Sequence, residues 1–247
     1  MKRIAAINGV AIAITAVGIG LVGCGSPSSS NSAASKTSTT STTSTTTTTG
    51  KPQSKVSPRT TVPGPNPTIA SYIQQSGIAD APVHRGDPGA PTINLPIPDG
   101  WADAGPDTPA TAYWAIIDNG PEAAKYTPSV VATVSKLVGD VDQQKILDLA
   151  PGELKNLPGF QPKGDGSDDN LGGFPAYESG GTWVENGRTK AVAQKTVVIE
   201  ANDAVYLLQL NIDCLADQID QVLPATATID EKTTIPVGGE RPSDAGI

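Results

Sequence analysis

Residues 182–200 read TWVENGRTKAVAQKTVVIE, and this stretch decides the fold. Asn186-Gly187 separates two runs rich in β-branched residues, and this dipeptide favours a tight type I′ turn between antiparallel strands. A second turn at residues 201–203 leads into the segment AVYLLQLNID at 204–213. One side of that segment is apolar and the other becomes polar, which is typical of an antiparallel sheet with one well-buried face. The apolar side consists of Tyr206, Leu208, Leu210 and Ile212.

Three earlier segments also have the patterns of strands. They are TINLPI at 92–97, TAYWAIID at 111–118 and SVVATVSKLVG at 129–139. In the third segment four apolar side chains alternate along one side of the predicted strand: Val130, Ala132, Val134 and Val138.

Three helices are predicted from caps and apolar spacing. The first begins at the cap Thr68 and stops at Gly77, and the second begins at the cap Asp142 and runs through Ala150. The third begins near Leu215, and Pro224 ends or kinks it. Ile229 keeps the same phase, so the alternative is a helix that resumes beyond the proline. No strand–helix–strand alternation of the kind that a parallel sheet requires is present. We therefore predict an α+β fold, with an antiparallel β-sheet flanked by helices.

The N-terminus has the layout of a bacterial lipoprotein signal peptide. Lys2 and Arg3 precede an uncharged stretch that ends in Leu21-Val22-Gly23-Cys24, which matches a lipobox. We predict cleavage after residues 1–23 and lipidation of Cys24, so that membrane lipid is a partner through the acylated sulfur. The alternative is an uncleaved membrane anchor, because the apolar stretch is long enough to span a bilayer.

Composition divides the remaining chain into three parts. Nineteen of the 26 residues from Gly25 to Gly50 are Ser or Thr, and a proline-rich stretch follows, so we expect residues 24–67 to be a disordered tether. A globular domain is predicted at 68–236, followed by a flexible tail at 237–247. The expected location is the outer face of the cytoplasmic membrane or the cell envelope. Whether the tether is glycosylated stays open.

Charge also separates along the chain. All 25 acidic residues follow the tether, together with 11 of the 17 basic residues, so the C-terminal part carries a net charge of −14. Such a domain repels nucleic acid, which we exclude as a partner.

The sequence predicts no catalytic residue, no cofactor and no metal site. The single histidine, His84, is expected at the surface in a turn, since no serine lies in a nucleophile-elbow motif. Asp165, Ser167 and Asp169 match three positions of a calcium loop, but Asn170 and Ala176 stand where glycine and glutamate are required, so a solvated hairpin loop is favoured.

Structural roles are expected for one cysteine and the three tryptophans. With Cys24 lipidated, Cys214 has no partner for a disulfide within the chain, and we expect a small buried side chain there, with a reactive thiol or an intermolecular cross-link as the alternatives. The three tryptophans, Trp101, Trp114 and Trp183, are expected in the core, with a strand edge or pocket mouth as the alternative for Trp101.

Several segments together resemble a known family. PTIASYIQQSGI at 67–78, VHRGDPGAPTINLPIPDGW at 83–101, PSVVATVSKLVG at 128–139 and NLGGFPAYESGGTW at 170–183 lead to the terminal TIDEKTTIP. The series is similar to the mycobacterial LpqN/LpqT lipoproteins. The resemblance implies a PsbP-like α/β/α sandwich without enzymatic activity, and a role in mycolate or trehalose lipid traffic beside RND-type exporters. It implies no site residue beyond Cys24, so the ligand-binding residues stay unknown.

Three functions are open on this basis. The first is a membrane-anchored binding module or adaptor with an apolar cleft for an envelope lipid, or with a surface for membrane transporters. The second is a protein-interaction scaffold without a lipid cavity. The third is a hydrolase of envelope glycolipids, which needs a nucleophile and base, or two carboxylates, in one cleft.

Overall fold

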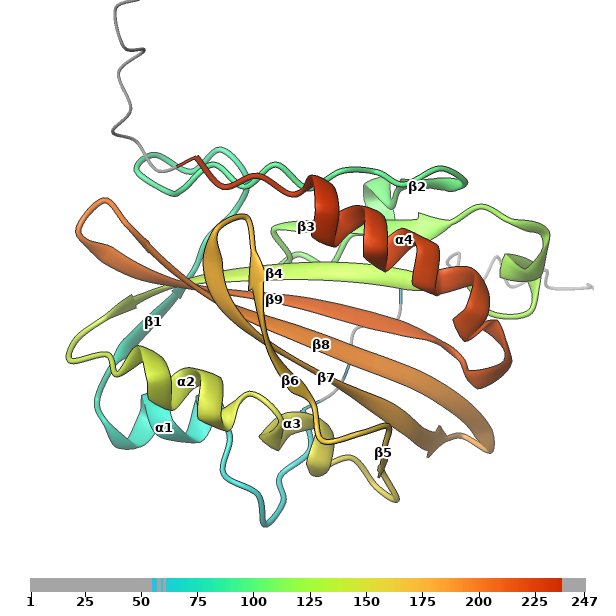
Figure 1. The fold of residues 1–247 in the computed structure, drawn as a ribbon, viewed down its shortest axis with the longest axis horizontal. Coiled ribbons are helices and arrows are strands. Elements are labelled where there is room, and N and C mark those ends of the chain that lie inside the picture. The colour runs from blue at the N-terminus through green and yellow to red at the C-terminus, as the bar shows by residue number, and fades with distance from the viewer. Residues whose placement is uncertain (1–54, 57–58, 60, 237–247) are drawn as a thin grey trace, which may run out of the picture. The chain divides into compact units, whose positions relative to one another are not determined.

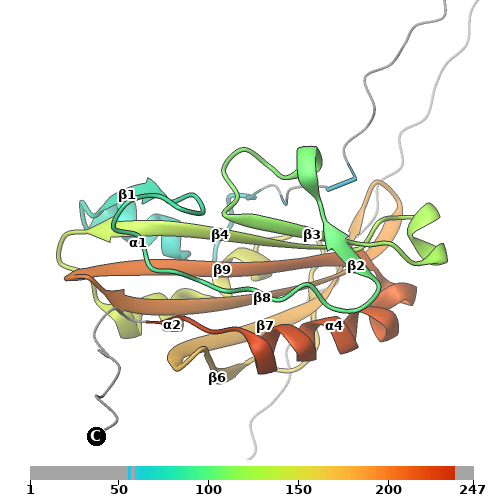
Figure 2. The same cartoon turned by 90° about the horizontal axis from the view of Figure 1, so that it is seen from above.

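The central feature of the chain is one antiparallel sheet whose strands pair in the order β2-β3-β4-β9-β8-β7-β5, with β1 on β4 and β6 on β7. This computed structural model describes residues 55–56, 59 and 61–236. The predicted signal peptide, Cys24 and the predicted tail lie outside the described residues, as does most of the predicted tether. Figure 2 shows β3, β4, β9 and β8 side by side in the order of their pairing.

The long strands of the sheet form a meander from β7 to β9. The strands are β1 (Ala79–Pro82), β2 (Trp101–Asp103), β3 (Trp114–Asp118), β4 (Ser129–Val138), β5 (Gln161–Pro162), β6 (Ser167–Leu171), β7 (Phe174–Glu185), β8 (Arg188–Ala201) and β9 (Ala204–Leu215). The helices are α1 (Ile69–Gln75), α2 (Gln143–Leu149), α3 (Gly152–Lys155) and α4 (Ile219–Lys232). Short 3₁₀ turns lie at Gly105–Asp107, Pro121–Ala124 and Ala216–Gln218.

The two predicted turns are confirmed. Asn186 and Gly187 have φ values of 51° and 75°, the left-handed conformation that a type I′ turn requires at both central positions. Asn202 and Asp203 have φ values of 52° and 57° between β8 and β9. These tight turns fix the register of the meander, because a two-residue connection leaves no slack between the strands.

Helices cover both faces of the sheet, which confirms the predicted α+β class. In Figure 1, α4 lies above the long strands and α1, α2 and α3 lie below them. The main core forms between α4 and the face that carries Leu208, Leu210 and Val130. On the opposite face, α1 and α2 pack over Leu137, Val198 and Leu207. The helix caps agree with the prediction, since Thr68 and Asp142 accept from the backbone N–H groups of Ser71 and Lys145.

Three predictions about local structure are wrong. TINLPI is not a strand; Asn94 makes one bridge to Thr234, and Pro96 in this segment and Pro98 just after it lack the N–H that a ladder needs. Leu215 belongs to β9 and not to the third predicted helix. At Pro224 only the alternative of an ended helix is wrong, because α4 continues through it, and the missing N–H removes one bond near the exposed residue Asp220.

The third concerns the end of β4. Val130, Ala132 and Val134 are buried as predicted, but Val138 is 56% exposed because it lies at the last position of the strand. The sequence also failed to indicate the short elements β1, β2, β5, β6 and α3; residues 167–171, which were expected in a solvated hairpin loop, form the strand β6 on β7.

Candidate functional site

Polar side chains occupy the centre of the sheet face opposite α4. Register partners in a sheet point to the same side, and here Thr196 pairs with Gln209, Gln194 with Asn211, and Thr133 with Gln209. We call this the polar sheet face; it consists of Ser129, Thr133, Ser179, Gln194, Thr196, Gln209, Asn211 and Asp213.

Apolar clusters surround this polar centre. One lies under α1 and α2, a second contains Ala104, Ala115 and Ile117, and a third contains Leu154, Leu157, Trp183 and Val192. The polar side chains therefore occupy the middle of a layer whose margins pack like a protein core. Such an arrangement is unusual for a face that serves stability alone, because buried polar groups need partners.

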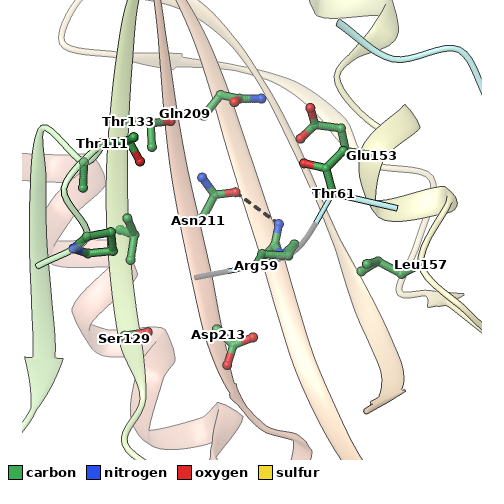
Figure 3. Close-up of a pocket in the computed structure, with 13 residues that line it drawn as sticks. Arg59, Thr61, Thr111, Ser129, Thr133, Glu153, Leu157, Gln209, Asn211 and Asp213 are labelled. Atoms are coloured by element: carbon green, nitrogen blue, oxygen red, sulfur yellow. Dashed lines mark hydrogen bonds between the residues drawn. The ribbon is translucent and has the colours of Figure 1, made fainter. Parts of the chain in front are cut away.

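A pocket of about 210 Å³ opens over the polar sheet face (Figure 3). Strands β4 and β9 supply its floor, Glu153 of α3 and the following Leu157 supply one wall, and Thr111 with its neighbours supplies another. Arg59 and Thr61, which precede α1, also line it. The pocket is smaller than the roughly 300–1,000 Å³ of typical ligand sites, so it suits a small polar group.

Arg59 makes three hydrogen bonds across this pocket. Its guanidinium donates to Asn211 Oδ1 at 3.1 Å, to the Ile212 carbonyl at 3.0 Å and to the Ala193 carbonyl at 3.3 Å. Burial lowers the pKa of Arg59, whereas the negative charges of Asp213 and Glu153 oppose that shift. The domain thus contributes only acceptors to this guanidinium.

A second buried cation lies beside the pocket. Lys190 is 4% exposed and binds Asp213 at 2.8 Å and Glu185 at 3.0 Å. Its ammonium lies 5.0 Å from the ring centre of Tyr126 and 5.9 Å from that of Trp183, and Tyr126 donates a hydrogen bond to Asp213. Burial alone would lower the pKa of Lys190, but Asp213, Tyr126 and Glu185 outweigh it and raise the pKa above its usual value.

Buried polar atoms without a hydrogen-bond partner gather at the same place. Within the described residues these atoms are Arg59 Nε, Ser179 Oγ, Trp183 Nε1, Gln194 Oε1, Thr196 Oγ1 and Gln209 Nε2. Every one belongs to the sheet face opposite α4 or to Arg59 above it. Thr196 is 0% exposed and Gln194 is 1% exposed. An unpaired buried polar group costs about 1–3 kcal/mol, so their concentration on one face points to a ligand-binding surface.

The other face of the sheet carries a groove of different character. A volume of about 530 Å³ lies between α4 and strands β7 and β8, where Gly180, Ala191, Ala193, Ile219 and Leu223 give it a mainly apolar lining. This groove meets the size expected of a site for an alkyl chain. Deeper under α4, Lys195 binds Asp169 and Asp230 at 2.6 Å and Glu178 at 3.0 Å.

The residues that the sequence considered for catalysis or metal binding are dispersed. His84 is exposed in a turn, as predicted, with Nε2 3.1 Å from the Ala110 carbonyl and Nδ1 3.6 Å from Asp87. Asp169 of the calcium-like loop pairs with Lys195, and β6 of the hairpin occupies Ser167–Leu171. Asp169, Glu178 and Asp230 could surround a metal ion, but the ammonium of Lys195 already lies among them.

The expected burial of Cys214, Trp114 and Trp183 is confirmed. Cys214 is fully buried, and burial raises the pKa of its thiol to about 12. Trp114 and Trp183 are buried, and Trp101 lies on the edge strand β2, where it packs against the core and lines a small pocket beside α4. Among the described residues, no helix has the length and hydrophobicity needed to cross a membrane.

The pocket contains two carboxylates, but both are already engaged. Asp213 is paired with Lys190 and Tyr126, and Glu153 accepts from the Gln194 amide at 3.2 Å. The polar side chains present donors and acceptors for a ligand rather than a nucleophile beside a free base. Fold and site together define an α+β domain with a polar pocket on one face of its antiparallel sheet.

Comparison with known proteins places this domain in a family. Residues 65–236 match the family described as "Probable lipoprotein LpqN". Lipoprotein LpqN of Mycobacterium tuberculosis (strain ATCC 25618 / H37Rv) is 51% identical over 172 residues, which cover 70% of this chain and 75% of that protein. A crystal structure of LpqN involved in cell envelope biogenesis of the same organism matches with a TM-score of 0.66 and 50% identity, over 70% of this chain and 99% of that one. The chain belongs to the LpqN lipoprotein family, which carries the name of a lipoprotein and not of an enzyme.

Proposed function

We propose that this chain is a lipid-anchored protein of the cell envelope, and that its domain is a non-enzymatic module that binds the hydroxyl-rich headgroup of an envelope glycolipid. The observation that carries the proposal is the cluster of unpartnered buried polar atoms around the 210 Å³ pocket. Hydroxyl groups both donate and accept, so they match this mixture of amide, hydroxyl and guanidinium groups. The size of the pocket suits one sugar ring and not a long acyl chain.

Family membership supports the setting of the proposal. The M. tuberculosis relative is described as involved in cell envelope biogenesis. The proposed location is the outer face of the cytoplasmic membrane, where the acyl group proposed on Cys24 would anchor the chain. In the same proposal, the protein acts beside membrane transporters as an adaptor in mycolate or trehalose lipid traffic. The apolar groove beside α4 lies on the opposite face of the sheet, so it would hold an alkyl chain as a separate site and not together with a headgroup in the pocket.

Lipidation is expected to depend on Cys24 alone. Labelled palmitate should enter the wild-type chain and the variant Cys214→Ser, because Cys214 is buried in the core. It should not enter Cys24→Ser, which should also leave the membrane fraction. Label that persists in Cys24→Ser, or wild-type protein that stays in the cytosol, would contradict the anchor.

We expect the polar sheet face to bind glycolipid and to lower the free energy of unfolding of the domain. Thr196→Val replaces a buried, unpartnered hydroxyl by a methyl group of similar shape, so we expect the free energy of unfolding to rise by about 1–2 kcal/mol. The same variant combined with Gln209→Leu should retain about tenfold less glycolipid, because two hydrogen-bonding groups are lost. Native mass spectrometry after gentle extraction measures the retained lipid.

The matched control is Thr189→Val on the same strand, where the side chain is exposed. It should alter neither stability nor lipid content. Wild-type protein that is repeatedly extracted without lipid, or site variants that retain lipid fully, would favour a protein-interaction scaffold instead.

A further inference from the structure

The guanidinium in the pocket comes from outside the family domain. The family match begins at residue 65, and Arg59 precedes it. Its neighbours in the described chain hold it over the sheet: Val56 is 2% exposed against Ala115 and Ile117, and Val62 packs in the cluster of Leu154, Leu157, Trp183 and Val192. Arg59 therefore belongs to the segment that precedes the family domain, and the packing of Val56 and Val62 places it over the sheet.

The groups that receive Arg59 all belong to the matched domain. Asn211 Oδ1 and the carbonyls of Ile212 and Ala193 accept its hydrogen bonds, and Glu153 and Asp213 add negative charge around the pocket. The three hydrogen-bond acceptors are neutral, and of the two carboxylates Asp213 is already paired with Lys190. A planar guanidinium with five N–H donors fits such a set, whereas the compact ammonium of lysine uses it less well.

We propose that the acceptors at the wall of this pocket form a guanidinium-binding site, which Arg59 occupies in cis and which the arginine side chain of another polypeptide segment occupies when Arg59 is withdrawn. Arg59 donates hydrogen bonds to three neutral acceptors, and its Nε has no partner. Replacement of Arg59 by another arginine would therefore break hydrogen bonds and no direct ion pair. Because Arg59 lies between the predicted anchor and the domain, its withdrawal would link the N-terminal flank to the opening of the pocket.

The partner inferred here is a polypeptide that supplies an arginine, and not the glycolipid of the proposed function. The two proposals share only the pocket, so this one rests on the proposed function in that respect alone. An arginine attached in cis has an effective concentration of about millimolar or more, so a free arginine competes poorly with it. Removal of Arg59 should therefore reveal binding that the wild-type chain conceals.

The test uses the full chain with Arg59→Ala and the probe N-acetyl-arginine amide. Titration is followed by the backbone amide signals of Ala193 and Asn211, and circular dichroism verifies the fold. We expect saturable binding to Arg59→Ala and binding about tenfold weaker to the wild type. The matched control Arg188→Ala, which removes an exposed arginine at the β7–β8 turn, should behave as the wild type.

Two comparison probes identify the chemistry. The lysine analogue should bind more weakly than the arginine probe, and the uncharged citrulline analogue should not bind measurably. If Arg59→Ala fails to fold, Arg59→Gln keeps part of the contact to Asn211 and takes its place. Folded variants that show no saturable binding, equal binding to the wild type, or equal binding of citrulline would overturn the inference. None of these results depends on a glycolipid, so they leave the proposed function to its own test.

Discussion

Lys195→Met is expected to lower the free energy of unfolding by about 3–5 kcal/mol. Lys195 is 3% exposed on β8, and its ammonium joins Asp169 of β6, Glu178 of β7 and Asp230 of α4. Burial alone would lower the pKa of Lys195, but the three carboxylates raise it above its usual value, so the charge persists to high pH. Methionine fills a similar volume and leaves the three carboxylates without a cation. Thermal and urea unfolding measure the loss.

Repulsion between the carboxylates makes this prediction testable in two further ways. Their ligand oxygens lie within 4.8 Å of one another, so millimolar Ca²⁺ should raise the melting temperature of Lys195→Met by several degrees and leave the wild type unchanged. Lys136→Met, at an exposed position of β4, is the control and should change stability by less than about 0.5 kcal/mol. A loss below about 1 kcal/mol in Lys195→Met would show that the cluster does not hold α4.

The pH dependence of the two proteins should have opposite signs. In the wild type, burial alone would raise the pKa of Asp169, but Lys195 and a backbone hydrogen bond lower it. The wild-type pair therefore adds stability above the ordinary pKa of 3.8, and this stability is lost as the pH falls through the lowered value. In Lys195→Met the crowded carboxylates gain from protonation, so stability should rise as the pH falls from 7 towards 4.5.

The sequence predicted the meander because local chemistry dictates it. Asn186-Gly187 favours only a narrow turn, and the alternation from Tyr206 to Ile212 assigns each side chain of β9 to a face. The same alternation indicated that Gln209, Asn211 and Asp213 form a polar side. It could not show that this side is covered, because the cover comes from α3 and from Arg59, which lie far away in the sequence.

Arg59 itself was missed for a physical reason. It lies in a proline-rich stretch without acidic residues, whose composition resembles a tether, and two of its three acceptors are main-chain carbonyls. Every residue has a main-chain carbonyl, so a sequence does not indicate which of them will accept a hydrogen bond from Arg59. The buried lysines were equally hidden. Lys190 and Lys195 are recognised as ion-pair centres only when the strand register places Asp213 and Glu178 near them and α4 brings Asp230 to Lys195.

Lys190→Met should lower the free energy of unfolding at neutral pH by about 3–5 kcal/mol, as much as Lys195→Met, because it leaves the buried carboxylate of Asp213 without a cation. Asp213 is 5% exposed, and burial raises its pKa although Lys190 and Tyr126 oppose the shift. A carboxyl whose folded pKa is raised binds more protons in the native state than in the unfolded state, so stability falls as the pH rises from 3.8 through the raised value. Without Lys190 this penalty grows, and the difference from the wild type should shrink steadily between pH 7 and pH 4.5.

The double variant Lys190→Met/Asp213→Asn separates the charge from the packing. Because neither partner is then charged, it should recover most of the lost free energy at pH 7 and lose the pH dependence. Glu185→Gln, which alters only the more exposed partner of Lys190, should cost less than about 1 kcal/mol. A double variant as unstable as Lys190→Met would mean that the side chain of Lys190 stabilises the site through its contacts with Tyr126 and Trp183 and not through Asp213. Urea titrations of the four proteins at the two pH values distinguish these outcomes.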